Sequence, residues 1–287
     1  APVAYQRMAH PDGELATAVA ASAQEAGFVL STQSSLLLET VARAVRDDDD
    51  RGPLWMQLYL QHDAGFNREL VRRAEAAGYE ALVLTVDAPC HGARDRERRA
   101  GFRLPPGISA VNLARLPPRP EPQLGPGQSA LFDALLGGAP TWDDIAWLQA
   151  NTRLPVLLKG ILHPDDAREA ARLQVGGVIV SNHGGRTLDT ALPTAAALPA
   201  IAEALEGRLP LLVDGGIRRG TDVLKALALG ASAVLVGRPY IFGLANAGAL
   251  GVAHVIRLLR DELEIAMALC GCRTLDDIGP ELLIAPG

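Results

Sequence analysis

The feature of this chain that most constrains its fold is a regular alternation of short apolar runs with longer amphipathic stretches. Seven apolar runs are typical of buried parallel strands, at residues 28–32, 54–60, 81–87, 155–160, 177–181, 209–215 and 233–237. Helical patterns lie between them, at residues 13–26, 35–46, 65–77, 164–173, 194–205 and 221–229. Strands that alternate with helices pair in parallel through right-handed crossovers, so the pattern predicts an α/β fold.

The number of strands separates two architectures for such a chain. Eight strands would close a TIM (β/α)8 barrel, whereas fewer would favour an open, doubly wound sheet. Besides the seven runs, Ala1, Pro2 and Val3 are interpreted as the end of a strand that precedes the others. The length of 287 residues suits one barrel domain. We therefore predict a single α/β TIM-barrel domain over residues 1–287, without its N-terminal segment and most of the first strand.

Residues 102–140 interrupt the alternation. This segment contains many prolines and glycines and few strand signals. Loops of this length are uncommon in a compact domain unless they act as lids or are disordered. We predict a mobile lid over about residues 102–140, with a short helix at residues 130–136.

Composition limits the possible partners and location. The formal net charge of −6 argues against a nucleic-acid surface. No signal peptide opens the chain and no apolar run is expected to span a bilayer, so we expect a cytoplasmic protein without a membrane partner. The three cysteines are few, and an odd number cannot all pair, so no disulfide framework is expected. Cys270 and Cys272 form only a weak metal pair, and no metal is expected.

The loop after the 177–181 strand carries the most informative residues. His183 and Arg186 lie three residues apart beside the pair Gly184 and Gly185. An arginine grips a carboxylate through two parallel hydrogen bonds, and a histidine moves a proton near neutral pH. Glycines allow the backbone to approach a flat ligand closely. The run therefore indicates an anion site with proton chemistry, although a lone histidine at a strand end is often structural.

Other polar residues lie in the last part of the remaining predicted strands or just after them, where a parallel barrel gathers its reactive groups. One set comprises Gln57, Tyr59, Thr85, Asp87 and Arg94. A second set lies at the last two strands and comprises Asp214, Gly215, Gly216, Arg218, Gly237 and Arg238. This set is typical of a phosphate pocket, although its glycines also suit simple turns.

Lys159 stands at another strand end, where a lysine is rarely buried without a partner. It suits a fixed cation beside a flavin ring, where it would stabilise the reduced form. A Schiff-base lysine, or a lysine that snorkels to the barrel rim, are the alternatives.

With these residues in place, the chain resembles the family of FMN-dependent α-hydroxy acid oxidases and dehydrogenases, which includes glycolate oxidase, lactate oxidase, mandelate dehydrogenase and hydroxymandelate oxidase. The most specific matches are Ser-Asn-His-Gly-Gly-Arg at 181–186 and Asp-Gly-Gly-Ile-Arg-Arg-Gly at 214–220. Further matching blocks lie at residues 8–14, 55–59, 82–89 and 158–161. The resemblance implies FMN-dependent oxidation of an (S)-2-hydroxy acid to the 2-keto acid, with electrons passed to oxygen or another acceptor.

The resemblance also implies a role for each matching residue. His183 would be the active-site base, and Asp87 would stabilise its protonated form. Arg186 and Arg94 would clamp the substrate carboxylate, and Tyr59 would hydrogen-bond the substrate oxygen. Cofactor contacts are implied for Pro2, Val3, Ala4, Ser31, Gln57, Thr85, Lys159, Ser181, Asp214, Gly215, Gly216, Arg218, Gly237 and Arg238.

The chain departs from the family at several points. Family members carry a further N-terminal stretch with a substrate-contacting tyrosine, so this chain is expected to be a fragment or a processed form. Gln33 stands where many relatives have a bulky residue, and His91 stands at a position that varies among relatives. Both residues are expected to shape the substrate pocket, with a solvent-facing His91 as the alternative. Ala4 favours an oxidase over a dehydrogenase. The resemblance implies a homo-oligomer, a tetramer or larger.

Two other functions stay open at this point. One is a different enzyme on a phosphate-binding barrel, which would have no need for two arginines around a carboxylate. The other is a non-catalytic or impaired FMN-binding fragment, because the N-terminal part of the family pattern is missing.

Overall fold

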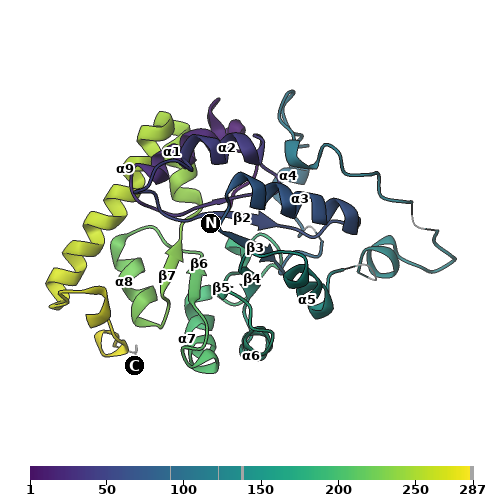
Figure 1. Cartoon of the computed structure of the whole chain (residues 1–287). Helices are drawn as coiled ribbons and strands as arrows, with labels where there is room; N and C mark the ends of the chain where they lie inside the picture. The colour runs from purple at the N-terminus through teal and green to yellow at the C-terminus, as the bar shows by residue number, and fades with distance from the viewer. Residues whose placement is uncertain (91, 122, 137–138, 285–287) are drawn as a thin grey trace.

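The computed structural model describes residues 1–90, 92–121, 123–136 and 139–284. Within these residues the chain forms one curled sheet of seven parallel strands (Figure 1). The strands are β1 (Phe28–Leu30), β2 (Leu54–Leu58), β3 (Ala81–Thr85), β4 (Val156–Ile161), β5 (Gly177–Val180), β6 (Leu211–Asp214) and β7 (Ala233–Leu235). All seven predicted strands are confirmed.

The order of the strands decides between the two architectures. Each strand pairs with its neighbours in sequence, from β1 to β7, without the reversal that a doubly wound sheet requires. The sheet is therefore of the TIM-barrel type. Among the described residues β1 and β7 do not pair with each other, so they remain the two edges of an incomplete barrel.

Helices cover the outside of the sheet, and they are α1 (Gly13–Ser22), α2 (Leu38–Val45), α3 (Ala64–Ala77), α5 (Trp142–Ala150), α6 (Pro164–Arg172), α7 (Thr194–Leu205), α8 (Gly220–Ala228) and α9 (Arg238–Cys270). The short helix α4 (Asp95–Arg99) lies in the loop after β3 instead. The six helices predicted from sequence are confirmed, whereas α4, α5 and α9 were not predicted. Short 3-10 turns occur at Gln6–Met8, Val111–Leu113, His183–Gly185, Leu275–Asp277 and Pro280–Leu282.

Local signals explain where several helices begin and end. Helix α3 begins after Asp63, whose carboxylate accepts a hydrogen bond from the Phe66 amide at 2.6 Å. It ends at Gly78, which adopts φ 91° in the left-handed region. Helix α5 starts with a capping box formed by Thr141 and Asp144. This signal directly follows the proline-rich segment 102–140, and the helix that it starts was not predicted.

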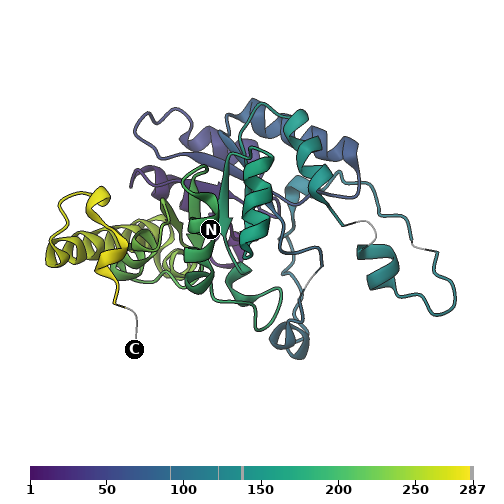
Figure 2. The same ribbon diagram turned by 90° about the horizontal axis from the view of Figure 1, so that it is seen from below.

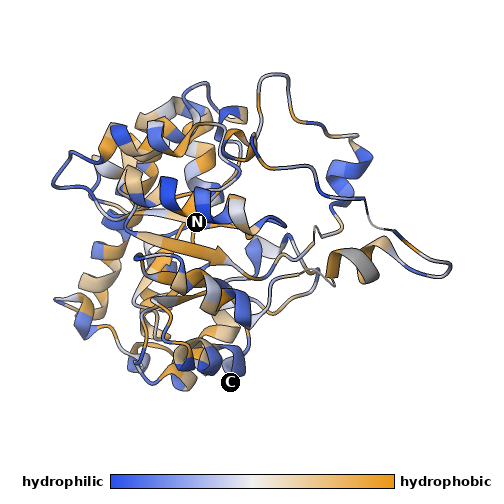
Figure 3. Ribbon diagram, turned by 45° about the vertical axis from the view of Figure 1, so that its right-hand side comes forward, coloured by the Kyte–Doolittle hydropathy of each residue, from blue (hydrophilic) through white to orange (hydrophobic). Residues whose placement is uncertain are grey.

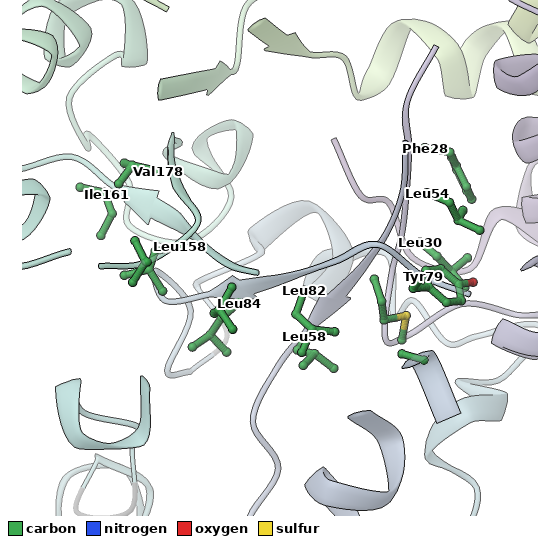
Figure 4. Close-up of a cluster of buried hydrophobic side chains, with 14 of the residues drawn as sticks. Phe28, Leu30, Leu54, Leu58, Tyr79, Leu82, Leu84, Leu158, Ile161 and Val178 are labelled. Atoms are coloured by element: carbon green, nitrogen blue, oxygen red, sulfur yellow. The ribbon is translucent and has the colours of Figure 1, made fainter. Parts of the chain in front are cut away.

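Both faces of the sheet are buried, as expected for parallel strands. On β3, Leu82 and Leu84 pack outward against the helices, while Val83 points into the barrel interior with Leu157 and Ile179. Figure 4 shows the outer cluster, with labelled side chains from five successive strands. Figure 3 shows the hydropathy of each residue, with largely hydrophobic strands inside and hydrophilic residues on the outer helices.

The N-terminal residues run across the gap between β7 and β1. The Ala1 ammonium donates to the Val236 carbonyl at 2.5 Å, and the Tyr5 amide donates to the Gln33 carbonyl at 3.1 Å. The remnant strand predicted at Ala1–Val3 is not formed, since these residues pair with neither neighbour along a register. The segment nevertheless links the carboxyl ends of β7 and β1, which places it at the rim of the barrel.

The described residues of the 102–140 segment extend away from the barrel, on the side opposite α9 (Figures 1 and 2). The short helix predicted at its far end is present as a π-helical turn at Ala130–Leu135. Nearer the barrel the segment is anchored by the buried side chain of Asn112, which hydrogen-bonds to Ser34, Leu36 and Leu38. A lid function for this segment stays a prediction.

Helix α9 bears on the expectation that no apolar run of this chain spans a bilayer. Among the helices in the described ranges, it alone is long and apolar enough to cross a membrane by length and composition. This criterion is weak evidence, since core helices and signal sequences also satisfy it. The helix is broken at Ala247 and Gly248, and its two halves pack on α1 and α8.

Candidate active site

The carboxyl ends of the strands surround one cavity of about 560 Å³. Its walls come from the N-terminal segment and from residues at or just after every strand from β1 to β7. Every residue predicted for the site lines this cavity except Asp87 and Ser181. These two lie directly behind cavity residues that they contact, so the structure brings the whole predicted set together.

His183 is held in one orientation by a carboxylate. Its Nδ1 lies 2.8 Å from Asp87 Oδ1, and its Nε2 lies 3.4 Å from the Tyr59 hydroxyl. A carboxylate only accepts hydrogen bonds, so Nδ1 carries the proton in the neutral ring and Nε2 keeps its lone pair. His183 has φ 57°, a left-handed conformation that is uncommon for a residue with a side chain.

Tyr59 remains a hydrogen-bond donor over the whole neutral range. Burial, reinforced by the negative charge of Asp87, raises the pKa of Tyr59 to about 12. Asp87 Oδ2 is buried and has no hydrogen-bond partner among the described residues. At this point of the cavity, His183 Nε2 can accept a proton, and it lies beside the Tyr59 phenol, which can donate a hydrogen bond.

Lys159 forms a buried ion pair at the end of β4. Only 4 % of the residue is exposed, and its Nζ lies 3.0 Å from Asp214 Oδ2 and 2.8 Å from Ser181 Oγ. Snorkelling to the rim is excluded by this burial. Two of the three ammonium N–H groups are engaged, which leaves one for a group in the cavity.

Ser181 lies behind the cavity wall. The structure buries its side chain completely, and the cofactor contact that the resemblance implies for it stays a prediction. Its hydroxyl accepts from Lys159 and from the His183 amide, at 2.8 Å and 3.1 Å. Ser181 therefore supports these two residues, and the cavity surface belongs to them.

The ends of β6 and β7 form a cradle for an anion. Gly215 and Gly216 have φ 92° and 82°, and a Cβ on Gly216 would meet no atom within 4 Å, so this backbone faces open space. Helix α9 starts at Arg238 without a side-chain cap. Free N–H groups and the helix dipole favour a negative group at such an end. Two arginines, Arg218 and Arg238, also line the cavity here.

A polar edge faces this cradle from β1, β2 and β3. Gln57 is buried, and its Oε1 accepts from Ser31 Oγ at 3.3 Å and from the Thr32 amide at 3.1 Å. Its Nε2 donates to Thr85 Oγ1 at 3.0 Å. These bonds fix the amide orientation, so the predicted polar edge is preorganised.

The comparisons with known proteins agree with this geometry. Residues 1–285 match the family described as FMN-dependent dehydrogenase. The chain belongs to this family. It is 51 % identical to L-lactate oxidase from Nostoc sp., over 99 % of this chain and 78 % of the relative. It is 45 % identical to glycolate oxidase 3 from Arabidopsis thaliana, over 97 % of this chain and 74 % of that protein. It thus spans about three quarters of the relatives' length.

Solved structures of this family have the same fold. A mandelate oxidase variant with an FMN adduct superposes with a TM-score of 0.85 at 45 % identity, over 97 % of this chain and 76 % of that one. A variant with (S)-mandelic acid gives a TM-score of 0.84, also at 45 % identity, over 96 % and 74 % of the two chains. The resemblance found in the sequence is confirmed, and FMN is the cofactor of this family member.

An observation in this structure, independent of the comparisons, supports the fit of these residues to FMN. Asp214 Oδ1 is buried without a hydrogen-bond partner among the described residues, which is costly unless a ligand supplies a donor. A sugar-like hydroxyl is such a donor, and the glycine cradle beside Asp214 suits a phosphate. The free N–H group of Lys159 and the edge around Gln57 complete a site with one charged and one neutral polar wall.

The two predicted carboxylate-binding arginines lie on one side of the cavity, but a residue that we did not predict stands between them. Glu97 Oε1 lies 2.9 Å from Arg186 Nη2, and Glu97 Oε2 lies 3.3 Å from Arg94 Nη1. Burial alone would raise the pKa of Glu97, but the hydrogen bond from Arg186 and the nearby Arg94 hold it below its usual value. The i, i+3 spacing of Arg94 and Glu97 was the available signal.

Other cavity residues were also missed. They bring apolar surface from four places: Tyr5 and Met8 from the N-terminal segment, Phe102 and Leu104 from the start of the 102–140 segment, Ile217 from the loop after β6, and Ile241 from α9. Gln33 lines the cavity as expected, whereas His91 lies outside the described residues.

Proposed function

We propose that this protein oxidises an (S)-2-hydroxy acid to the corresponding 2-keto acid, with FMN as its redox group. The observation that carries the proposal is the arrangement of one cavity wall. A proton-accepting nitrogen, His183 Nε2, and two arginines, Arg94 and Arg186, line the cavity that also contains the cradle for FMN. The relatives, named lactate, glycolate and 2-hydroxyacid oxidases, support the same reaction class.

Each side chain has a task in this reaction. Arg94 and Arg186 bind the carboxylate, so the carbon that carries the hydroxyl is held in one orientation. Tyr59 donates a hydrogen bond to the substrate oxygen, because its raised pKa keeps the phenol protonated. His183 Nε2 accepts the proton that the substrate loses on oxidation. Asp87 lies 2.8 Å from Nδ1 and stabilises the imidazolium that results.

FMN, when bound, accepts the two electrons that leave the substrate. The chain's contribution on that side is a fixed positive charge. Lys159 is held by Asp214 and Ser181 within 3.0 Å, so its ammonium does not have to reorganise as negative charge develops nearby. We further propose oxygen as the final acceptor, as the oxidase relatives and Ala4 at the cavity wall suggest.

Cellular location and assembly are finer proposals. The three cysteines are free, which supports a reducing compartment such as the cytoplasm. Large apolar side chains on the outside of α9, such as Phe242 and Leu250, support assembly into a homo-oligomer.

The proposal is tested by mixing the FMN-loaded protein with hydroxy acids without oxygen. We expect L-lactate, glycolate or (S)-mandelate to bleach the flavin absorbance, and D-lactate and the uncharged lactamide to do so far more slowly. Admission of air should restore the colour if oxygen is the acceptor. Bound flavin that no hydroxy acid bleaches would identify a non-catalytic FMN-binding protein, and protein that never retains flavin would contradict the proposal altogether.

A further inference from the structure

Glu97 bridges the two arginines that face the substrate position. One carboxylate oxygen binds Arg186 and the other binds Arg94, at 2.9 Å and 3.3 Å. We propose that Glu97 is a positioning residue, which holds the two guanidinium groups together so that they bind the carboxylate of the hydroxy acid as a pair. This inference rests on the proposed function and concerns the same site.

The charges explain why such a bridge is needed. Arg94 follows β3 and Arg186 follows β5, so no shared element keeps the two side chains together. Two like charges a few ångströms apart repel each other. Glu97 offsets this repulsion and leaves the group of three with a net charge of +1. One further carboxylate makes the group neutral, which matches the single negative charge of a 2-hydroxy acid.

The arginines keep enough donors for a second carboxylate. Each guanidinium has five N–H groups, and Glu97 is within hydrogen-bond distance of one terminal nitrogen of each. Arg94 Nε is buried and has no hydrogen-bond partner among the described residues. Such a donor is costly unless something satisfies it. The arginines are therefore bridged without being saturated.

Glu97 is itself held by the loops around it. Its carbonyl accepts a hydrogen bond from the amide of Phe102, another cavity residue, at 2.9 Å. On the other side of α4, the backbone at Gly92 approaches the loop of Arg186 so closely that a Cβ would lie 2.1 Å from the Thr187 carbonyl oxygen. The two loops are thus in contact, and Glu97 joins their charged side chains at the cavity.

The experiment compares an anion with its uncharged amide in Glu97→Gln. Pyruvate and pyruvamide differ in the carboxylate, and neither has the hydrogen that the reaction removes. We expect the variant to bind pyruvate about three- to tenfold more weakly by calorimetry, and pyruvamide as well as the unchanged protein does. With a hydroxy acid, KM should rise by a similar factor while kcat stays nearly constant, because His183 and Tyr59 are untouched.

Two controls separate this role from a general effect. Asp95→Asn removes the same charge from α4, at an exposed carboxylate that pairs with neither arginine in the described structure, and it should leave pyruvate binding unchanged. Glu97→Asp should recover part of the affinity. Equal or tighter pyruvate binding by Glu97→Gln would overturn the inference, because Glu97 would then be redundant or a competitor of the substrate. If the unsubstituted protein bound neither pyruvate nor pyruvamide, that result would instead contradict the proposed function.

Discussion

At the scale of single residues, the site depends on buried polar groups that bind one another. Lys159, Asp214 and Ser181 form one such group, and Asp87 and His183 form another. The sequence revealed these residues because each lies near or just after the carboxyl end of a strand, and parallel strands deliver these ends to the same rim. It did not reveal that Ser181 lies behind Lys159, because the depth of a side chain depends on packing between neighbouring strands.

The Lys159 pair gives a prediction about stability. Lys159→Met removes one partner of a buried ion pair and leaves the Asp214 carboxylate uncompensated. We expect the free energy of unfolding of the flavin-free protein to fall by about 3–5 kcal/mol. The double variant Lys159→Met, Asp214→Leu should recover most of this loss, since an apolar pair carries no stranded charge. Urea denaturation measures both, and a loss below about 1 kcal/mol in the single variant would refute the buried pair.

At the scale of elements, strands and regular helices were predictable, whereas α9 was not. Its glycines lower helix propensity, so the local pattern gave no helix after residue 229. The structure explains two of these glycines, because the two halves of α9 meet at Gly243 and Gly251. A Cβ on Gly251 would lie 1.9 Å from the Gly243 carbonyl oxygen, so a side chain does not fit there. This contact is a property of the folded kink at Ala247 and Gly248, and no window of sequence contains it.

The anchor of the 102–140 segment can be tested in the same way. Asn112 is 1 % exposed and bonds to Ser34 Oγ, the Leu36 carbonyl and the Leu38 amide. Asn112→Ala removes all three bonds and leaves the buried Leu38 amide without its partner, whereas Ser34 Oγ still donates to the Leu36 carbonyl. We expect a loss of about 1–3 kcal/mol in the free energy of unfolding. Gln128→Ala, in the exposed part of the same segment, should change it by less than about 0.5 kcal/mol. Equal effects of the two substitutions would show that Asn112 is no anchor.

At the scale of the whole molecule, the fold places residues that are far apart in sequence around one cavity. Strand order and the motifs at strand ends predicted this gathering, so the cavity and its phosphate side could be inferred without coordinates. The contact between the loops of Arg94 and Arg186 could not, because it depends on how two irregular segments pack. The role of Glu97 is visible only in the folded molecule.

The most direct test of the account is the rate of anaerobic flavin reduction in His183→Gln. Glutamine keeps a polar side chain of similar reach but cannot accept the proton as imidazole does. We predict that the variant retains FMN, because the cradle at β6 and β7 is unchanged, and that a saturating hydroxy acid reduces its flavin about 10²- to 10⁴-fold more slowly than in the unsubstituted protein. Flavin reduction at a rate close to that of the unsubstituted protein would contradict the account.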